Sequence, residues 1–148
     1  MAVKVLAGKL GKTYQSDAGW DLYADGNYTV PARSSAVINT GVRLSIPEGV
    51  VGKIESRSGL SVKNKLEVGA GVIDSGYHGE IKVHLHNFSD TNYTVVDQDR
   101  IAQILFIELS KTDVIYAYED EVSSERGDNG FGSTGKGGAH EVLKSTNI

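Results

Sequence analysis

A chain of 148 residues without cysteine is long enough for one domain with a single core, and it excludes disulfides, thiolate zinc sites and thiol nucleophiles. The net charge of −4, from 15 basic and 19 acidic residues, gives no general attraction to the phosphates of nucleic acid. The N-terminal apolar run is too short for a signal peptide and none spans a bilayer, so we expect no membrane or nucleic-acid partner and a cytoplasmic location.

Short strands joined by turns are predicted along most of the chain, which has 18 glycines and 2 prolines. In chain order the candidate strands are residues 4–8, 21–24, 36–47, 50–56, 80–87, 93–96 and 101–109. The clearest is 80–87, where Ile81, Val83 and Leu85 alternate with polar residues, whereas 101–109 is too apolar to expose either face. Only 59–67 favours a helix, and a short one. Turn residues at close intervals indicate an all-β sandwich or barrel.

The composition changes near the C-terminus, where residues 123–138 are mostly glycine and polar side chains. We therefore expect a single β domain over residues 1–122 and a mobile C-terminal arm over residues 123–148. The segment "ERGDNGFGSTG" in this arm combines an arginine, a phenylalanine and a Ser-Thr pair. It is either a disordered tail or a flap that closes over an anionic ligand.

The segment "SRSGL" at 56–60 lies between a candidate strand and the candidate helix. Arg57 offers a fork of donors that suits phosphate oxygens, while Ser58 and Gly59 let a hydroxyl and a backbone N–H approach the same group. The alternative is an ordinary surface turn.

The segment "GAGVIDSGYHGE" at 69–80 places a carboxylate, Asp74, between an apolar pair and a glycine turn. There it could polarise a water molecule, and Tyr77 could lie against a flat or sugar-like ligand. Alternatively, Asp74 is a turn residue whose side chain bonds the local backbone.

Asp21 in "DAGWDLYA" could contact a hydrated divalent cation, because magnesium favours carboxylate oxygen and keeps several waters. Alternatively it pairs with a buried arginine, and "DRIAQILF" supplies Arg100 together with Gln103. His84 and His86 share the outer face of one strand and could hold zinc only with a third ligand from elsewhere, so we expect solvated histidines.

Together these segments describe a phosphate-rich ligand, a metal ion and one positioned water. Their order resembles the five motifs of the trimeric deoxyuridine triphosphate nucleotidohydrolases (dUTPases): "AGWDLYA", "SRSGL", "GVIDSGYHGEIKV", "DRIAQILF" and "RGDNGFGSTG", over residues 18–135. The resemblance implies an all-β distorted jelly roll, the β-clip of this family, assembled as a homotrimer with sites where subunits meet. It also implies hydrolysis of dUTP to dUMP and pyrophosphate with Mg²⁺.

The resemblance also implies a role for each matching residue. Asp74 matches the general base that activates the attacking water, Tyr77 the ring against deoxyribose, and Asp21 a magnesium contact through water. The matches for substrate binding are Gly71, Val72 and Ile73 at uracil, Arg57, Ser58, Gly59 and Gln103 at the phosphates, and Arg126, Phe131, Gly132, Ser133 and Thr134 in the closing arm.

The chain departs from the usual motifs at Trp20, Gly76, His78 and Asn129, none of which replaces a catalytic group. Two other functions are open. A dCTP deaminase would need a glutamate ten residues after Asp74, where this chain has His84. A non-catalytic nucleotide-sensing module of the same fold is the second.

Overall fold

The computed structural model describes residues 1–132 and 135–136. The chain divides into two units, Met1–Lys111 and Thr112–Ile148, which are described separately. The arm boundary expected after residue 122 stays a prediction. In the part of the chain that the structure describes, no helix has the length and apolar character needed to cross a membrane.

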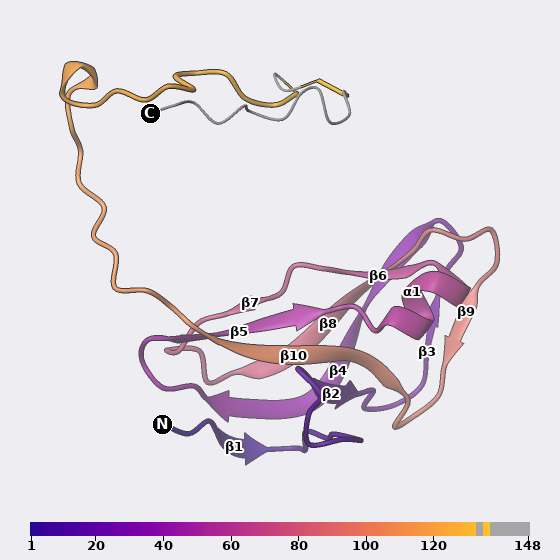
Figure 1. Cartoon of the computed structure of the whole chain (residues 1–148). Helices are drawn as coiled ribbons and strands as arrows, with labels where there is room; N and C mark the ends of the chain where they lie inside the picture. The colour runs from indigo at the N-terminus through magenta and orange to yellow at the C-terminus, as the bar shows by residue number, and fades with distance from the viewer. Residues whose placement is uncertain (133–134, 137–148) are drawn as a thin grey trace. The chain divides into compact units, whose positions relative to one another are not determined.

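The first unit is built from antiparallel strands, as the turn-rich sequence predicts (Figure 1). One sheet has the order β1 (Lys4–Ala7), β4 (Ser34–Ser45), β8 (Glu80–Asn87) and β6 (Leu66–Gly69). A second has the order β2 (Trp20–Tyr23), β10 (Arg100–Glu108), β5 (Val50–Glu55) and β7 (Val72–Ile73). A third pairs β3 (Tyr28–Val30) with β9 (Tyr93–Val95). The all-β fold class is confirmed.

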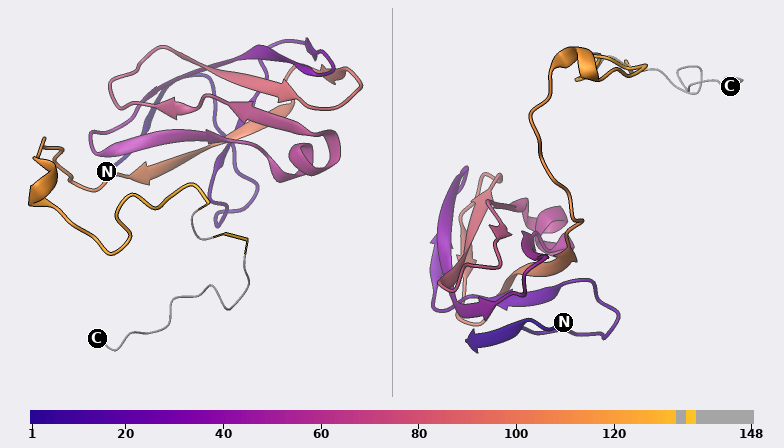
Figure 2. Two further views of the ribbon diagram at one scale, coloured as in Figure 1. Left: turned by 90° about the horizontal axis from the view of Figure 1, so that it is seen from above. Right: turned by 90° about the vertical axis from the view of Figure 1, so that its left-hand side faces the viewer.

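The hydrophobic core is formed by buried side chains from all three sheets. Figure 2 shows the arrangement of the strands from two further sides. On β8 the alternation predicted from the sequence holds, because Ile81, Val83 and Leu85 are all buried. The second sheet contributes Leu22 and Ile104, each fully buried. Burial of such side chains is the main favourable term for folding.

The helix is shorter than predicted. α1 spans Ser58–Asn64 and ends at Lys65, which adopts the left-handed conformation (φ 56) and returns the chain into β6. Leu66, placed in the helix by the sequence pattern, is therefore a buried strand residue. Strands β3, β6 and β7 were not predicted. β6 overlaps the segment that favours a helix, and β7 has only two residues.

The prediction that residues 101–109 expose neither face is wrong at their C-terminal end. β10 pairs with β2 only as far as Ile104, and beyond that residue it pairs with β5 alone. Ile107 and Leu109 are consequently 41% and 56% exposed.

His84 and His86 lie on the outer face of β8, as predicted, but they are half-buried rather than fully solvated. Their ring centroids are 4.2 Å apart, and His84 Nε2 lies 3.0 Å from the Ser35 hydroxyl. Both rings pack over Gly69, where an added Cβ would lie 2.5 Å from His86 Nε2. Glycine is needed at 69 for this packing.

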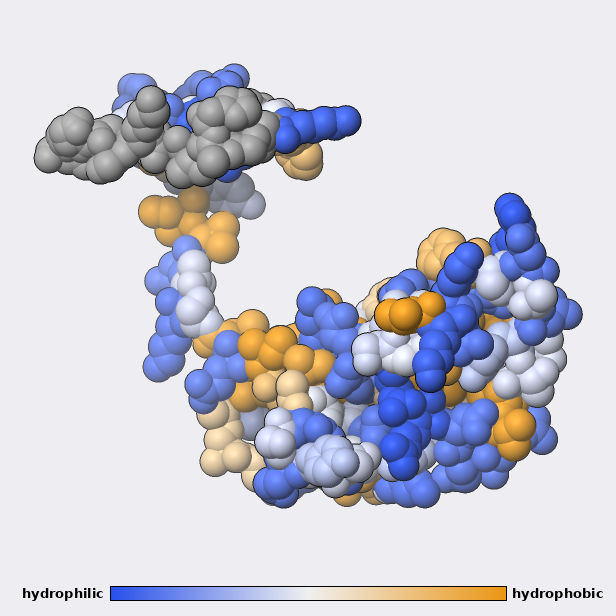
Figure 3. Space-filling view, turned by 45° about the vertical axis from the view of Figure 1, so that its right-hand side comes forward, coloured by the Kyte–Doolittle hydropathy of each residue, from blue (hydrophilic) through white to orange (hydrophobic). Residues whose placement is uncertain are grey.

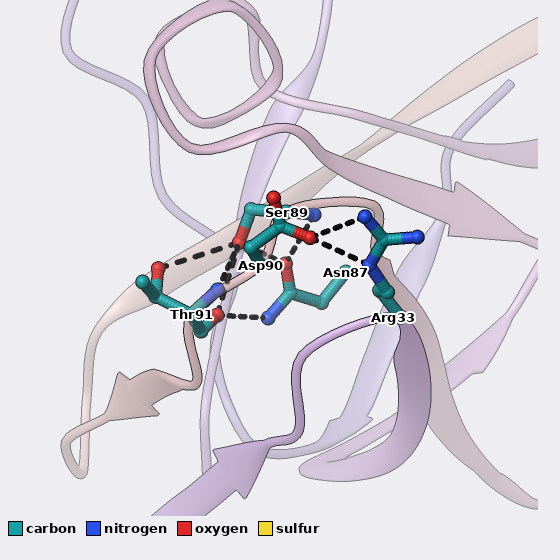
Figure 4. A network of polar contacts seen from close by, with 5 residues as sticks. All are labelled: Arg33, Asn87, Ser89, Asp90 and Thr91. Atoms are coloured by element: carbon teal, nitrogen blue, oxygen red, sulfur yellow. Dashed lines mark hydrogen bonds and ion pairs between the residues drawn. The ribbon is translucent and has the colours of Figure 1, made fainter.

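A polar network closes the loop after β8 (Figure 4). Asn87 is 1% exposed, and its amide donates to the carbonyls of Val30 (3.0 Å) and Thr91 (2.8 Å). Its side-chain oxygen accepts from the N–H (2.9 Å) and hydroxyl (2.7 Å) of Ser89. Arg33 pairs with Asp90 at the exposed edge of the same loop. The buried amide thus ties β8 to β3.

We expect Asn87→Ala to lower the free energy of unfolding by about 2 to 3 kcal/mol, because it leaves buried backbone carbonyls without their donor. Urea unfolding followed by circular dichroism measures this loss. Asn64→Ala, at an exposed helix position, is the matched control and should stay within about 0.5 kcal/mol of wild type. A loss for Asn87→Ala as small as the control's would contradict a stabilising role for the network.

The second unit exposes large apolar side chains. Its one short helical element among the described residues is the 3₁₀ turn η1 (Glu119–Glu121). The exposed side chains are Val114 (86%), Ile115 (80%), Tyr116 (103%), Tyr118 (78%) and Val122 (67%). Figure 3 shows apolar side chains on the surface of the molecule among hydrophilic ones. Clustered exposure of this kind is typical of a surface that contacts another chain.

Candidate active site

Strand register brings three of the sequence motifs to one end of the second sheet. Gln103 on β10 lies opposite Asp21 on β2 and opposite Glu55 on β5. Arg57 follows Glu55 by two residues, at the point where β5 leads into α1. Residues 21, 57 and 103 are therefore neighbours in space although they are far apart in the sequence.

The Asp21 carboxylate lies between two arginines. Its oxygens are 3.4 Å from Arg57 Nε and 3.9 Å from Arg100 Nε, and its side chain is only 16% exposed. The pairing with Arg100 that the sequence left open is thus present, although Arg100 itself is 47% exposed rather than buried. This one carboxylate offsets part of the charge of the two arginines and pairs with Arg57 at the wall of the cleft described next.

The cleft around Arg57 is polar. It measures about 270 Å³ and is lined by Thr13, Asp17, Ala18, Gly19, Asp21, Arg57, Ser58, Gly59 and Gln103. Gln103 Nε2 donates to the Ser56 carbonyl at 2.9 Å, and Gly19 leaves room for the Gln103 side chain, because a Cβ there would lie 2.4 Å from Oε1. Gly59 faces open space. Guanidinium, hydroxyl and amide donors in one cleft suit phosphate oxygens.

A second cleft lies around Asp74. It measures about 280 Å³ and is lined by Val72, Ile73, Asp74, Tyr77, Glu80, Ile81 and Lys82. The turn that carries the exposed Asp74 is closed by a backbone bond from Tyr77 N to Asp74 O (3.0 Å). The Tyr77 hydroxyl donates to the Glu80 carbonyl at 2.7 Å, and Tyr77 forms part of the wall of the cleft.

Gly71 brings backbone close to backbone beside this cleft. Its carbonyl accepts from Ile54 N at 2.8 Å, and an added Cβ would lie 2.9 Å from the Ile54 carbonyl oxygen. The next residue, Val72, is 66% exposed, so this strand edge is open to a ligand.

The two clefts are separate within one chain. Ile73 pairs with Gly52 near the start of β5, whereas Arg57 follows five residues later, which corresponds to about 17 Å of extended chain. No residue lines both clefts. Each cleft is also slightly smaller than the roughly 300–1,000 Å³ typical of small-molecule sites. The structure thus brings the candidate residues together in two groups rather than one.

Three candidate residues of the arm are described and two are not. Arg126 and Asn129 form a turn, in which Asn129 N donates to Arg126 O at 3.1 Å, and Phe131 is fully exposed. Gly132 follows in the left-handed region (φ 98). Ser133 and Thr134 lie outside the described residues.

Three of the four departures from the family motifs make contacts that the structure describes. Trp20 lines an apolar cleft with Val5 and Phe106, and the Lys12 ammonium lies 4.7 Å from the centre of its ring. The His78 carbonyl accepts from Arg43 Nε at 2.8 Å. Asn129 still closes the turn with Arg126 described above.

The residues around Asp21 fit a magnesium ion contacted through water, because the Asp21 carboxylate already pairs with Arg57 and Arg100. Asp17 lies in the same cleft, but its carboxylate accepts from Tyr14 N (2.9 Å). Among the described residues, no three metal-ligating side chains form a cluster. Magnesium in proteins is commonly held by one or two carboxylates together with waters and substrate phosphates, and of these ligands the cleft itself supplies the carboxylates of Asp17 and Asp21.

Sequence reasoning did not find Glu67, whose carboxylate accepts hydrogen bonds from Ser56 and Ser61 on either side of Arg57. These hydroxyls hold the pKa of Glu67 below its ordinary value. No local motif marks this residue, because β6 lies beside the turn that carries Arg57 only in the folded chain.

Comparison with known proteins groups this chain with one family. Residues 9–135 match the family model for dUTPase. The deoxyuridine 5'-triphosphate nucleotidohydrolase of Candida glabrata is 40% identical over 80% of this chain and 83% of its own length. The protein of the same name from Oryza sativa subsp. japonica is 45% identical over 80% of this chain and 68% of its own.

Solved structures agree with this grouping. The dUTPase of Staphylococcus bacteriophage 80alpha, solved as a variant with dUpNHpp, has a TM-score of 0.81 at 29% identity and covers 90% of this chain and 98% of its own. A variant dUTPase of phage phi11 of S. aureus, described with a structural Mg(II) ion, has a TM-score of 0.73 at 25% identity over 80% of this chain and 98% of its own.

Proposed function

The chain belongs to the dUTPase family, and from this premise we propose that it hydrolyses dUTP to dUMP and pyrophosphate. The observation that carries the proposal is the polar cleft in which Arg57, Asp21 and Gln103 are held side by side by strand register. The relatives reported above are all dUTPases, so neither the deaminase nor the non-catalytic sensor gains support.

Asp74 is the proposed general base. Its exposed carboxylate at the mouth of a tight turn would orient a water molecule and take its proton as the water attacks the α-phosphorus. Tyr77 would pack against deoxyribose, with no room for a 2′-hydroxyl. The backbone of Gly71, Val72 and Ile73 would bond the uracil edge, and cytosine would leave those groups unpaired.

The phosphates would be held in the other cleft. The Arg57 guanidinium can donate two parallel hydrogen bonds to one phosphate group. Ser58, Gly59 and Gln103 add a hydroxyl, a backbone N–H and a carboxamide as further donors. Asp21 would contact Mg²⁺ through water, and the ion would neutralise charge on the phosphate oxygens. In the arm, Arg126, Ser133 and Thr134 would donate hydrogen bonds to the γ-phosphate. Phe131 would stack on uracil, and Gly132 would let backbone amides approach the phosphate oxygens.

A homotrimer is the proposed assembly, with each site formed between chains. The separation of the Asp74 and Arg57 clefts within one chain supports it. So do the exposed apolar residues Ile107 and Leu109 at the end of β10 and those of the segment 114–122. The cytoplasmic location expected from the sequence stays a prediction.

A pyrophosphate-release assay tests the activity. We expect rapid release from dUTP in magnesium buffer, little from dTTP, dCTP or UTP, and a large fall when EDTA removes the metal. Sedimentation of the same sample should give three chains per particle. Ammonia release from dCTP would instead identify a deaminase, and a monomer without activity on dUTP would overturn the proposal.

A further inference from the structure

Glu67 joins the two ends of the turn that carries Arg57. Its carboxylate accepts from the Ser56 hydroxyl at 2.8 Å and from the Ser61 hydroxyl. Ser56 immediately precedes Arg57, and Ser61 lies in the first turn of α1. One side chain from β6 therefore spans the segment that holds Arg57, Ser58 and Gly59.

The contacts of Ser56 extend this support to Gln103. The Ser56 hydroxyl accepts from Val68 N at 2.9 Å, and its carbonyl accepts from Gln103 Nε2 at 2.9 Å. A shift of Ser56 would therefore move two of the proposed phosphate-binding side chains at once. The start of α1 has no anchor of its own, because the side chain of its N-cap residue Arg57 makes no capping hydrogen bond.

The charge of Glu67 gives it no direct part in holding phosphate. A carboxylate beside phosphate oxygens repels them. The serine hydroxyls lower the pKa of Glu67, so it is ionised at neutral pH. Both of its oxygens accept from serine, while Arg57 pairs with Asp21 instead. What Glu67 contributes is the geometry of the turn.

We propose that Glu67 is a positioning residue for phosphate binding, which acts by holding Ser56 and Ser61 so that Arg57, Ser58 and Gln103 converge on the same oxygens. The inference rests on the proposed function, because it assumes that this turn binds the phosphates of dUTP and of the pyrophosphate product. A misplaced binding group can cost a large part of the rate even when the chemistry is untouched.

The first test compares Glu67→Ala with Glu67→Gln. We expect Glu67→Ala to raise KM for dUTP and the inhibition constant of pyrophosphate about tenfold, with a smaller change in kcat. Glu67→Gln should stay within about threefold of wild type, because a carboxamide can accept from one serine and donate to the other. Glu48→Gln is the matched control and should change neither constant, since Glu48 is exposed in the turn between β4 and β5 and lines neither cleft.

The second test separates positioning from a general loss of structure. In an Arg57→Ala background, Glu67→Ala should raise the pyrophosphate inhibition constant by no more than about threefold further, because only its effect on Ser58 and Gln103 remains. A full tenfold effect in that background, or none in wild type, overturns the inference. Wild-type protein that releases no pyrophosphate from dUTP would overturn the proposed function instead, so the two failures are distinguishable.

Discussion

Asp74→Asn is expected to lower kcat for dUTP by about 10²–10⁴-fold while nucleotide binding persists. The carboxamide occupies the same volume at the same exposed turn, so the backbone bond from Tyr77 N to Asp74 O is kept. It cannot accept a proton at neutral pH, and the attacking water loses its base. Single-turnover hydrolysis with enzyme in excess measures the chemical step, and calorimetry with dUpNHpp measures binding.

Asp90→Asn is the control for this substitution. Asp90 pairs with Arg33 on an exposed loop, with both side chains about three quarters exposed, so its neutralisation should leave turnover unchanged. If single-turnover hydrolysis by Asp74→Asn stays within about tenfold of wild type, Asp74 is not the base.

Mixing Asp74→Asn chains with Arg57→Ala chains is expected to restore activity that neither variant has alone. The two residues line different clefts of one chain. A site shared between chains would take Asp74 from one and Arg57 from another, so random assembly of equal amounts leaves about a quarter of the sites intact. Unfolding and refolding the mixture, followed by the pyrophosphate assay, measures the recovery.

The control for this mixture replaces the Arg57→Ala chain with a chain that carries both substitutions. No chain in that mixture has an intact Asp74, so no activity should return. Absence of recovery in the first mixture, with exchange of chains verified by mass spectrometry, would mean that each chain has a complete site.

The fold was predictable where the alternation of apolar and polar residues extends over a whole strand. Residues 80–87 alternate over a whole strand and form β8. Residues 72–73 form a strand only because they pair with β5, a long-range contact without a local signal. The exposed end of β10 could not be foreseen either, since an apolar run does not reveal where its neighbouring strand stops.

The candidate site was predictable as a set of residues but not as an arrangement. The motifs named Asp21, Arg57 and Gln103, and the register of β2, β10 and β5 explains why they meet. That Asp74 lies in a different cleft depends on the register of β7 against β5. Glu67 was missed because its serine partners come from two other elements, and only the folded chain brings the three together.

The position of Trp20 has a spectroscopic consequence. It is the only tryptophan in the chain, it is 37% exposed, and it lies in the apolar cleft beside Val5 and Phe106. Indole emission moves to shorter wavelength when water leaves the ring. A second chain that covers this cleft would therefore shift the Trp20 emission to shorter wavelength. The rate at which mixed chains associate could then be followed by intrinsic fluorescence without a label.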